Sequence, residues 1–98
     1  MRFKLKYTPT ADKQYEDLKN STDKLPEFKA VRKALGLMEV NLKHKSLHTH
    51  KYDSLSGPNG EEVFEAYAEN NTPGAYRIFW YYGPKRGMIT ILSIIPHP

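Results

Sequence analysis

The residues with the clearest chemical potential are an arginine flanked by aromatic residues and a histidine between two prolines. Arg77 lies in a run of alternating residues from Tyr76 to Tyr82. A guanidinium on the open face of such a strand can bind a phosphate through two hydrogen bonds while bases stack on neighbouring rings. Arg77 could equally pair with a carboxylate such as Glu65 and be structural. His97 stands in a tail whose two prolines restrict the backbone.

Positive charge is concentrated in the first half of the chain. Residues 1–52 hold 12 Lys and Arg against 6 Asp and Glu, and residues 53–98 hold 3 against 5, which gives net charges of +6 and −2. No acidic residue lies between Glu39 and Asp53. That stretch alternates lysines and histidines: Lys43, His44, Lys45, His48, His50 and Lys51. Such a stretch favours a polyanionic partner, either nucleic acid or an acidic protein segment, although a solvated surface explains the charge equally well.

The composition predicts one folded domain spanning residues 1–98. Of the 98 residues, 39% are hydrophobic and 27% are charged, which suits a folded protein. The absence of cysteine excludes disulfides, zinc–thiolate sites and thiol nucleophiles. No apolar run approaches the roughly 20 residues of a membrane helix. The first residues lack the apolar core of a signal peptide, so we expect no membrane association and a cytoplasmic location.

The first half of the chain predicts a strand followed by two helices. Residues 3–7 alternate apolar and polar side chains, as a half-buried strand does. Thr8 and Pro9 provide an N-cap and a first helical residue. The two helices then show apolar stripes at helical spacing. The stripes comprise Ala11, Tyr15 and Leu18 in the first helix and Phe28, Val31, Leu35, Met38 and Leu42 in the second.

The second half predicts a loop and a three-stranded meander. Residues 54–60 form the loop, the strands are expected at 62–68, 76–82 and 88–95, and the turns at 70–74 and 83–87. The order is therefore β-α-α-β-β-β, an α+β fold in which a helical hairpin packs on one face of an antiparallel sheet. We assign Tyr76, Ile78 and Trp80 to the helix-covered face. The opposite face, with Val63, Glu65, Tyr67, Arg77, Phe79 and Tyr81, is then expected to be open.

In order and spacing, these segments resemble the RelE/ParE toxin superfamily over nearly the whole chain. The resemblance rests on the opening strand with its Thr8-Pro9 cap, the helical hairpin, the segment Leu47–Tyr52, the strand around Arg77 and a final strand ending at His97. RelE-like members are ribosome-dependent endoribonucleases that cut mRNA. ParE-like members poison DNA gyrase and carry no nuclease site. An antitoxin protein holds both kinds inactive.

The resemblance implies a toxin that cleaves RNA through the substrate's own 2′-hydroxyl. Such cleavage needs a base, a cation for the phosphorane and an acid for the leaving oxygen. We assign Arg77 to the phosphate, His97 to the acid and Glu65 to the base. Two departures matter: Pro98 replaces the family's usual final tyrosine, and Glu65 stands where some members carry lysines. An alternative base or cation comes from His48, His50 or Lys51.

The remaining expectations concern RNA contacts, metals and partners. The candidate RNA-binding residues are Lys43, Lys45, His48, His50, Lys51, Tyr67, Tyr81, Lys85 and Arg86. Three of the histidines (48, 50 and 97) could in principle bind zinc, but nothing else resembles a zinc site, and we expect no metal or cofactor. The expected partners are a cognate antitoxin, in a hetero-oligomer, and the ribosome with its mRNA. A gyrase-directed toxin and an inactive protein-binding member of the same fold stay open.

Overall fold

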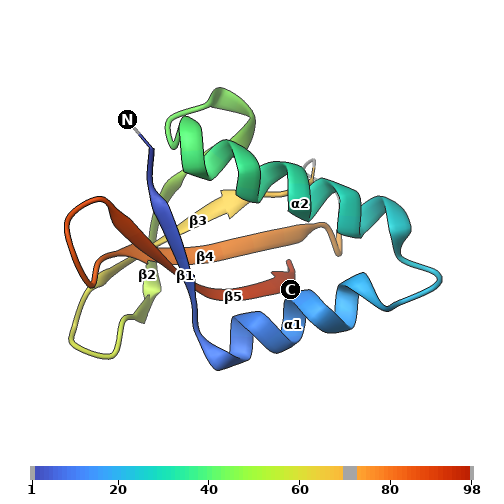
Figure 1. The fold of residues 1–98 in the computed structure, drawn as a ribbon, viewed down its shortest axis with the longest axis horizontal. Coiled ribbons are helices and arrows are strands. Elements are labelled where there is room, and N and C mark those ends of the chain that lie inside the picture. Colours follow the sequence, from blue (N-terminus) through green and yellow to red (C-terminus); the bar gives the residue numbers. More distant parts are fainter. Residues whose placement is uncertain (1, 70–72, 98) are drawn as a thin grey trace.

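In the computed structural model, which describes residues 2–69 and 73–97, the chain folds into a sheet with two helices on one face (Figure 1). The elements are, in chain order, β1 (Lys4–Tyr7), α1 (Pro9–Lys19), α2 (Leu25–Val40), the short 3₁₀ helix η1 (Lys45–Leu47), β2 (His50–Ser56), β3 (Glu62–Tyr67), β4 (Tyr76–Tyr82) and β5 (Met88–Pro96). The α+β class and the helical hairpin are as predicted. The predicted turn at 70–74 lies largely outside the described residues.

The sheet differs from the prediction in two respects. Its order is β1-β5-β4-β3-β2, and β1 pairs with β5 in parallel, so the sheet is mixed and not wholly antiparallel. The parallel pair is possible because the helical hairpin carries the chain from β1 across one face before the meander begins. The second difference is β2, an additional antiparallel edge strand that pairs with β3 where a basic segment and a loop were expected.

Local signals explain where the first helix begins and how it is tied to the sheet. The Thr8 hydroxyl oxygen accepts a hydrogen bond from the Ala11 amide at 3.0 Å, and Pro9 follows as the first helical residue. The same hydroxyl donates to the Leu92 carbonyl at 2.9 Å. Farther along α1, the Gln14 side-chain oxygen accepts from the Ile94 amide at 2.7 Å. Both side chains therefore anchor α1 to β5.

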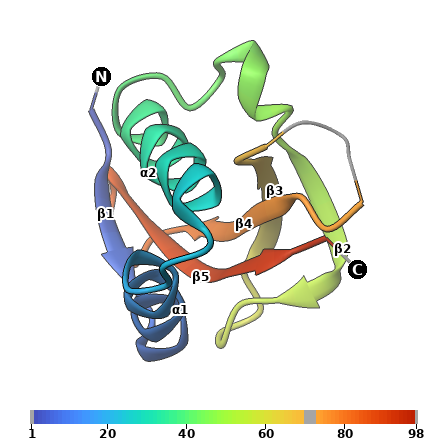
Figure 2. The same cartoon turned by 90° about the vertical axis from the view of Figure 1, so that its right-hand side faces the viewer.

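The hydrophobic core lies between the helices and the sheet. From the sheet, Ile78 and Trp80 of β4 are fully buried, as their alternation predicted. From the helices, Val31 and Met38 of α2 are equally buried, and both belong to the predicted stripe. Figure 2 shows α1 and α2 nearly end-on against the same side of the twisted sheet. Among the described residues, no helix is long and apolar enough to cross a membrane.

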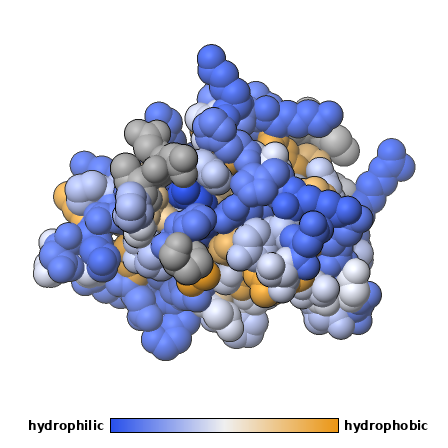
Figure 3. All heavy atoms as spheres, turned by 180° about the vertical axis from the view of Figure 1, so that it is seen from behind, coloured by the Kyte–Doolittle hydropathy of each residue, from blue (hydrophilic) through white to orange (hydrophobic). Residues whose placement is uncertain are grey.

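The opposite face of β4 is buried as well, and the prediction of an open face is therefore wrong at this strand. Arg77 is 1% exposed, Phe79 2% and Tyr81 7%. The helices do not cover these residues. The ring of Tyr52 from β2 packs on Phe79 with 4.8 Å between ring centroids, and the ring of Tyr67 from β3 covers Arg77. The additional edge strand β2 thus helps to cover the face that was predicted to be open. Seen from behind the molecule, the surface on this side is mainly hydrophilic (Figure 3).

Candidate functional site

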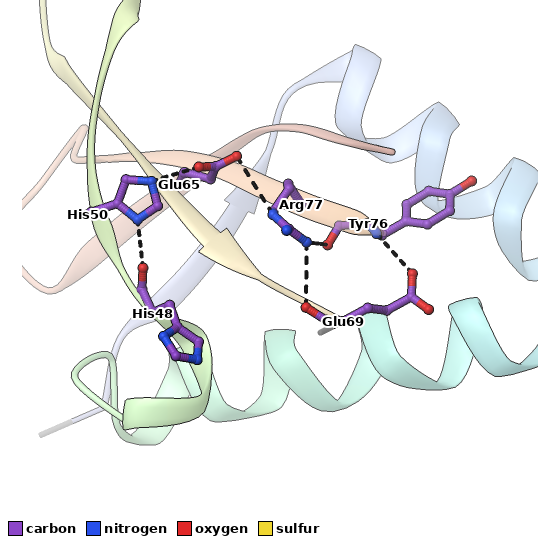
Figure 4. Close-up of polar contacts among 6 residues, drawn as sticks. All are labelled: His48, His50, Glu65, Glu69, Tyr76 and Arg77. Atoms are coloured by element: carbon purple, nitrogen blue, oxygen red, sulfur yellow. Dashed lines mark hydrogen bonds and ion pairs between the residues drawn. The ribbon is translucent and has the colours of Figure 1, made fainter. Parts of the chain in front are cut away.

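Arg77 lies at the centre of a cluster of polar and aromatic side chains on β2, β3 and β4 (Figure 4). In the sheet register Arg77 is paired with Tyr67 of β3 on one side and with Ile95 of β5 on the other. The guanidinium carbon is 3.7 Å from the centre of the Tyr67 ring. A cation so close to a ring face is attracted by the ring's electron density, and the attraction is strongest where water is excluded.

The guanidinium is only partly satisfied by hydrogen bonds. Its Nη1 donates to the Tyr76 carbonyl at 3.2 Å and makes a longer contact of 3.5 Å to the Glu69 carbonyl. Its Nε is buried and has no hydrogen-bond partner among the described residues. Buried polar groups are normally paired, so an unpaired donor on a buried arginine marks a place where an acceptor can still be added.

Glu65 supplies the negative charge of the cluster. Its carboxylate is nearly buried and lies between two cationic or potentially cationic groups. One carboxylate oxygen is 2.7 Å from Nε2 of His50, and the other is 3.9 Å from Nε of Arg77. The structural alternative considered for Arg77, a pairing with Glu65, is therefore present as a loose ion pair and not as a two-bond fork.

His50 connects the buried carboxylate to solvent. It stands opposite Glu65 in the β2–β3 register, and its side chain is 47% exposed. Its second ring nitrogen, Nδ1, is 2.7 Å from the carbonyl oxygen of His48. Both nitrogens face acceptors, so the ring satisfies both either as an imidazolium or by sharing a proton with Glu65. Glu65 and His50 thus form one hydrogen-bonded unit whose accessible end is the imidazole.

His48 also reaches the cluster, although it precedes β2 and does not lie on the strand that carries His50. It caps η1 in the left-handed conformation, with φ of 46° and ψ of 39°. Few residues other than glycine adopt this conformation. Its ring centroid is 5.0 Å from that of Tyr67, and that of His50 is 5.9 Å away. Both histidines therefore gather around the ring that covers Arg77.

His97 directly follows the last residue of β5. Its amide donates to the Ala75 carbonyl at 2.7 Å, which extends the β4–β5 ladder by one residue. By strand alternation His97, Ile95 and Arg77 share a face. His97 is then the diagonal neighbour of Arg77, and such neighbours lie roughly 7–8 Å apart. The alternation of β5, extended by one residue to His97, therefore predicts a row of Glu65, Arg77 and His97 with the guanidinium in the middle.

The predicted RNA contacts do not all belong to this cluster. Lys43 precedes η1, Lys45 is the first residue of η1, and both are exposed. Lys51 pairs with Glu62 at 3.2 Å. Tyr81 is too deeply buried to offer a ring face to a base, which removes the basis for its predicted role. Lys85 and Arg86 lie in the exposed β4–β5 hairpin. From Arg77 to that end of β4 the strand spans about 17 Å.

Sequence reasoning missed the Glu65–His50 unit and the position of Tyr67 over Arg77. The available signal was the loop Gly57–Gly60 between two extended segments, which is where a hairpin pairing β2 with β3 would turn. Metal binding finds no support in the geometry. Within residues 2–69 and 73–97, no group of three or more His, Cys, Asp or Glu side chains could hold a metal ion, and the three histidines considered for zinc do not form such a group.

Comparison with solved structures identifies the fold. The chain is similar to archaeal RelE in a RelE–RelB complex from Pyrococcus horikoshii OT3, with a TM-score of 0.64, 16% identity and coverage of 98% of this chain and 96% of that one. It is also similar to a YoeB/ParE toxin from Agrobacterium tumefaciens, with a TM-score of 0.69, 11% identity and coverage of 98% and 100%. The YoeB dimer from Staphylococcus aureus gives a TM-score of 0.62 and 16% identity, with both chains fully covered.

These similarities confirm the resemblance to the RelE/ParE superfamily at the level of the fold. The chain has the RelE-like fold, including the mixed five-stranded sheet and the helical hairpin. Neither a family model nor a curated protein matches the sequence. Identities of 10–16% transfer a fold and not an activity, so the function has to be argued from the side chains.

Proposed function

We propose that this protein is the toxin of a toxin–antitoxin pair and that it cleaves mRNA bound to the ribosome. The observation that supports the proposal best is the position of Arg77 beside Glu65 of β3 and next to the end of β5, from which strand alternation directs His97 to the same face. Cleavage through the 2′-hydroxyl needs a cation between a base and an acid. The RelE-like fold of the chain supports the same reaction class by analogy.

The proposed roles divide one cleavage reaction among these side chains. The 2′-oxygen attacks the phosphorus, the bond from phosphorus to the 5′-oxygen breaks, and a 2′,3′-cyclic phosphate and a 5′-hydroxyl form. Glu65, acting with its hydrogen-bonded His50, accepts the 2′-hydroxyl proton. Arg77 stabilises the charge on the phosphorane, and its unpaired Nε is the donor available for a phosphate oxygen. His97 donates the proton to the leaving 5′-oxygen.

The burial of Arg77 adds a step before the chemistry. At 1% exposure the guanidinium does not reach solvent, so a phosphate meets it only after the covering Tyr67 ring has moved. Substrate binding then replaces a cation–π contact with a charged hydrogen bond, which is the stronger interaction. This requirement fits an enzyme that is inactive without its ribosomal substrate, because binding of the mRNA has to supply the free energy of opening.

Primer extension on mRNA bound to translating ribosomes tests the proposal. Wild-type protein is expected to cut at defined codon positions. Arg77→Lys keeps the charge but loses the planar fork, and a loss of about 100-fold or more in rate is expected. His97→Ala is expected to lose about 10²- to 10⁴-fold. Arg32→Ala, which removes an exposed arginine from α2, is the matched control and keeps full activity. Folding of each variant is checked by circular dichroism.

A second candidate is a non-nuclease member of the same fold, and the burial of Arg77 favours it. A guanidinium held by Tyr67 and Glu65 also serves as a structural group. This candidate predicts intact mRNA together with inhibition of gyrase supercoiling, if the protein is ParE-like. It predicts neither effect, and no arrest of growth on induced expression, if the protein acts by binding alone. Intact mRNA in the ribosome assay would reject the nuclease proposal.

The proposed partner is an antitoxin protein. The archaeal RelE neighbour was solved in complex with RelB. The basic stretch of residues 43–51 would attract an acidic or amphipathic segment of such a protein. Co-expression with the product of the adjacent reading frame is expected to yield a co-purifying complex that abolishes toxicity. Purification of this chain alone from that co-expression would contradict the partner proposal.

A further inference from the structure

A hollow lies on the helix-covered side of the sheet, beside the residues that follow α2. It has a volume of about 400 Å³, which is within the range of roughly 300–1,000 Å³ typical of small-ligand sites. The residues that line it are Leu42, Lys43, His44, Lys45, His48, Thr49, Phe64, Trp80 and Tyr82. None of the catalytic roles proposed above uses this hollow.

Three aromatic rings form one side of the hollow. Phe64 of β3 stacks on Trp80 of β4 with 4.9 Å between centroids and 23° between ring planes, and Tyr82 meets Trp80 edge-on at 4.9 Å. Tyr82 is 52% exposed, which is unusual for an aromatic ring in contact with the core. Exposed aromatic rings next to positive charge are the platforms on which nucleic-acid bases stack in single-strand binding proteins.

Trp80 contributes an unsatisfied hydrogen-bond donor. The indole is fully buried, and its Nε1 has no acceptor among the described residues. Buried indole N–H groups usually find a partner. Trp80 lines the hollow, so a ligand there that carries a carbonyl oxygen or a ring nitrogen, as every nucleobase does, can supply one once the atoms that cover Nε1 have moved.

The opposite side of the hollow is cationic. Lys43 and Lys45 are exposed and form no ion pair with any described residue. His44 and His48 stand beside them. The absence of acidic residues between Glu39 and Asp53 leaves this charge uncompensated by its own segment. Lysine side chains of this kind bind phosphates as flexible point charges.

We infer that this hollow is a nucleotide subsite for single-stranded RNA, separate from the cluster around Arg77. One base stacks on Tyr82 and accepts a hydrogen bond from the Trp80 indole, and the adjoining phosphates bind Lys43 and Lys45. The inference deepens the proposed function and rests on it, because it assumes an RNA substrate. The acidic antitoxin segment proposed above would be attracted to the same lysines and would compete with RNA for them, but it would leave the aromatic platform and the indole N–H unused.

His48 connects the subsite to the cluster. It lines the hollow, and its ring is also 5.0 Å from that of Tyr67, which covers Arg77. A strand anchored in the hollow therefore passes His48 on its way to the proposed cleavage site. The subsite fixes the position of the RNA chain, and binding there can be measured without any cleavage.

Trp80 makes the test direct, because it is the single tryptophan of the sequence and lines the hollow. The probe is a short single-stranded oligonucleotide with 2′-O-methyl groups, which lacks the attacking hydroxyl. Titration of the wild-type protein is expected to give a saturable change in tryptophan fluorescence. Tyr82→Ala is expected to weaken binding about five- to 100-fold, the cost of one base stack, while Tyr82→Phe keeps wild-type affinity.

The lysines are tested through salt dependence. Lys43→Ala combined with Lys45→Ala is expected to reduce the slope of log affinity against log salt by about 1.4, since each phosphate contact to a single strand contributes roughly 0.7. The matched control, Lys19→Ala with Lys29→Ala, removes the same charge from exposed positions on the helices and leaves the slope unchanged. Thermal melts confirm that all variants are folded.

Several outcomes would overturn the inference. Wild-type affinity in Tyr82→Ala, or a slope reduced equally by both lysine pairs, would show that the hollow does not hold the RNA. A saturable fluorescence change with polyglutamate but none with the oligonucleotide would assign the surface to an acidic protein partner. Binding of the oligonucleotide without ribosomal cleavage would keep the subsite and reject the nuclease. Ribosomal cleavage that is unaltered in Tyr82→Ala, together with no fluorescence change in the wild type, would keep the nuclease and reject the subsite.

Discussion

Cationic groups lie beside aromatic rings on both sides of the sheet, and the two places differ in what surrounds the charge. Around Arg77, the cation is buried under Tyr67 and faces the carboxylate of Glu65. In the hollow beside α2, Lys43 and Lys45 are exposed and face an aromatic wall with no carboxylate among the lining residues. The first place is closed and nearly neutralised, and the second is open and positively charged.

The comparison shows that a cation beside an aromatic ring has different effects when it is buried and when it is exposed. A charge removed from water has to be compensated within the fold, so a buried Arg77 requires a carboxylate such as Glu65 and hydrogen-bond acceptors around it. A charge left in water costs the fold little and is free to attract a polyanion from a distance. We therefore expect the Arg77 cluster to control stability and chemistry, and the hollow to control binding and its salt dependence.

The largest expected effect is on stability. Arg77→Ala is expected to lower the free energy of unfolding by about 3–5 kcal/mol, because Glu65 is left buried with only His50 for compensation. Lys43→Ala, from the open region, is expected to change it by no more than about 0.5 kcal/mol. Urea denaturation followed by circular dichroism measures both. An equal loss of unfolding free energy in the two variants would contradict the proposed difference between the regions.

Removal of the ring that covers Arg77 sharpens the same contrast. Tyr67→Leu is expected to cost up to about 2 kcal/mol from the lost cation–π contact and to uncover the guanidinium. Labelling with phenylglyoxal, read by mass spectrometry, compares Arg77 with the exposed Arg32 and Arg86. In the wild type Arg77 should react slowest, because it reacts only during local opening. If Tyr67→Leu leaves that order and rate unchanged, the ring is not the cover.

His48 lies between the two regions, and variants at this position distinguish the effect of backbone strain on stability from the effect of the ring on binding. Its left-handed backbone costs a residue with a side chain roughly 1–2 kcal/mol, whereas glycine adopts it freely. His48→Gly is therefore expected to be about 1 kcal/mol more stable than His48→Ala. Both variants lack the ring, so both should lose oligonucleotide affinity to the same extent. Affinity that follows stability instead would mean that the ring has no part in binding.

The sequence predicts the elements whose own residues carry the pattern. The strand at Tyr76–Tyr82 and both helices are found where alternation and apolar stripes place them, since burial against one core imposes those periods. The exception is Leu42, which was assigned to the second stripe but follows the end of α2 at Val40 and is buried from the turn beyond it. Ile78 and Trp80 face the helices as expected. These assignments needed no knowledge of distant neighbours.

The features that the sequence did not predict depend on contacts between residues far apart in the chain. β2 is mostly exposed, so its seven residues show no apolar alternation, and it is a strand only because the edge of β3 is free to pair with it. Alternation divides the residues of β4 between two faces but does not say which face is covered. The burial of Arg77 and Tyr81 therefore could not be predicted, and the catalytic roles of Glu65, Arg77 and His97 stay predictions.

The smallest expected effect lies outside both regions, at Tyr7 on the far edge of the sheet. Burial, and then the negative charges of Tyr15, Glu39 and Asp12, raises the pKa of Tyr7 above its ordinary value of 10.0. Above that value the unfolded chain loses the proton first, so stability falls as the pH rises further. Tyr7→Phe is expected to flatten this decline in urea denaturation at alkaline pH. Oligonucleotide binding is then measured over the same pH range in both proteins. If binding weakens equally in the wild type and in Tyr7→Phe, the cause lies in the hollow. If Tyr7→Phe abolishes the weakening, the cause is unfolding of the wild type.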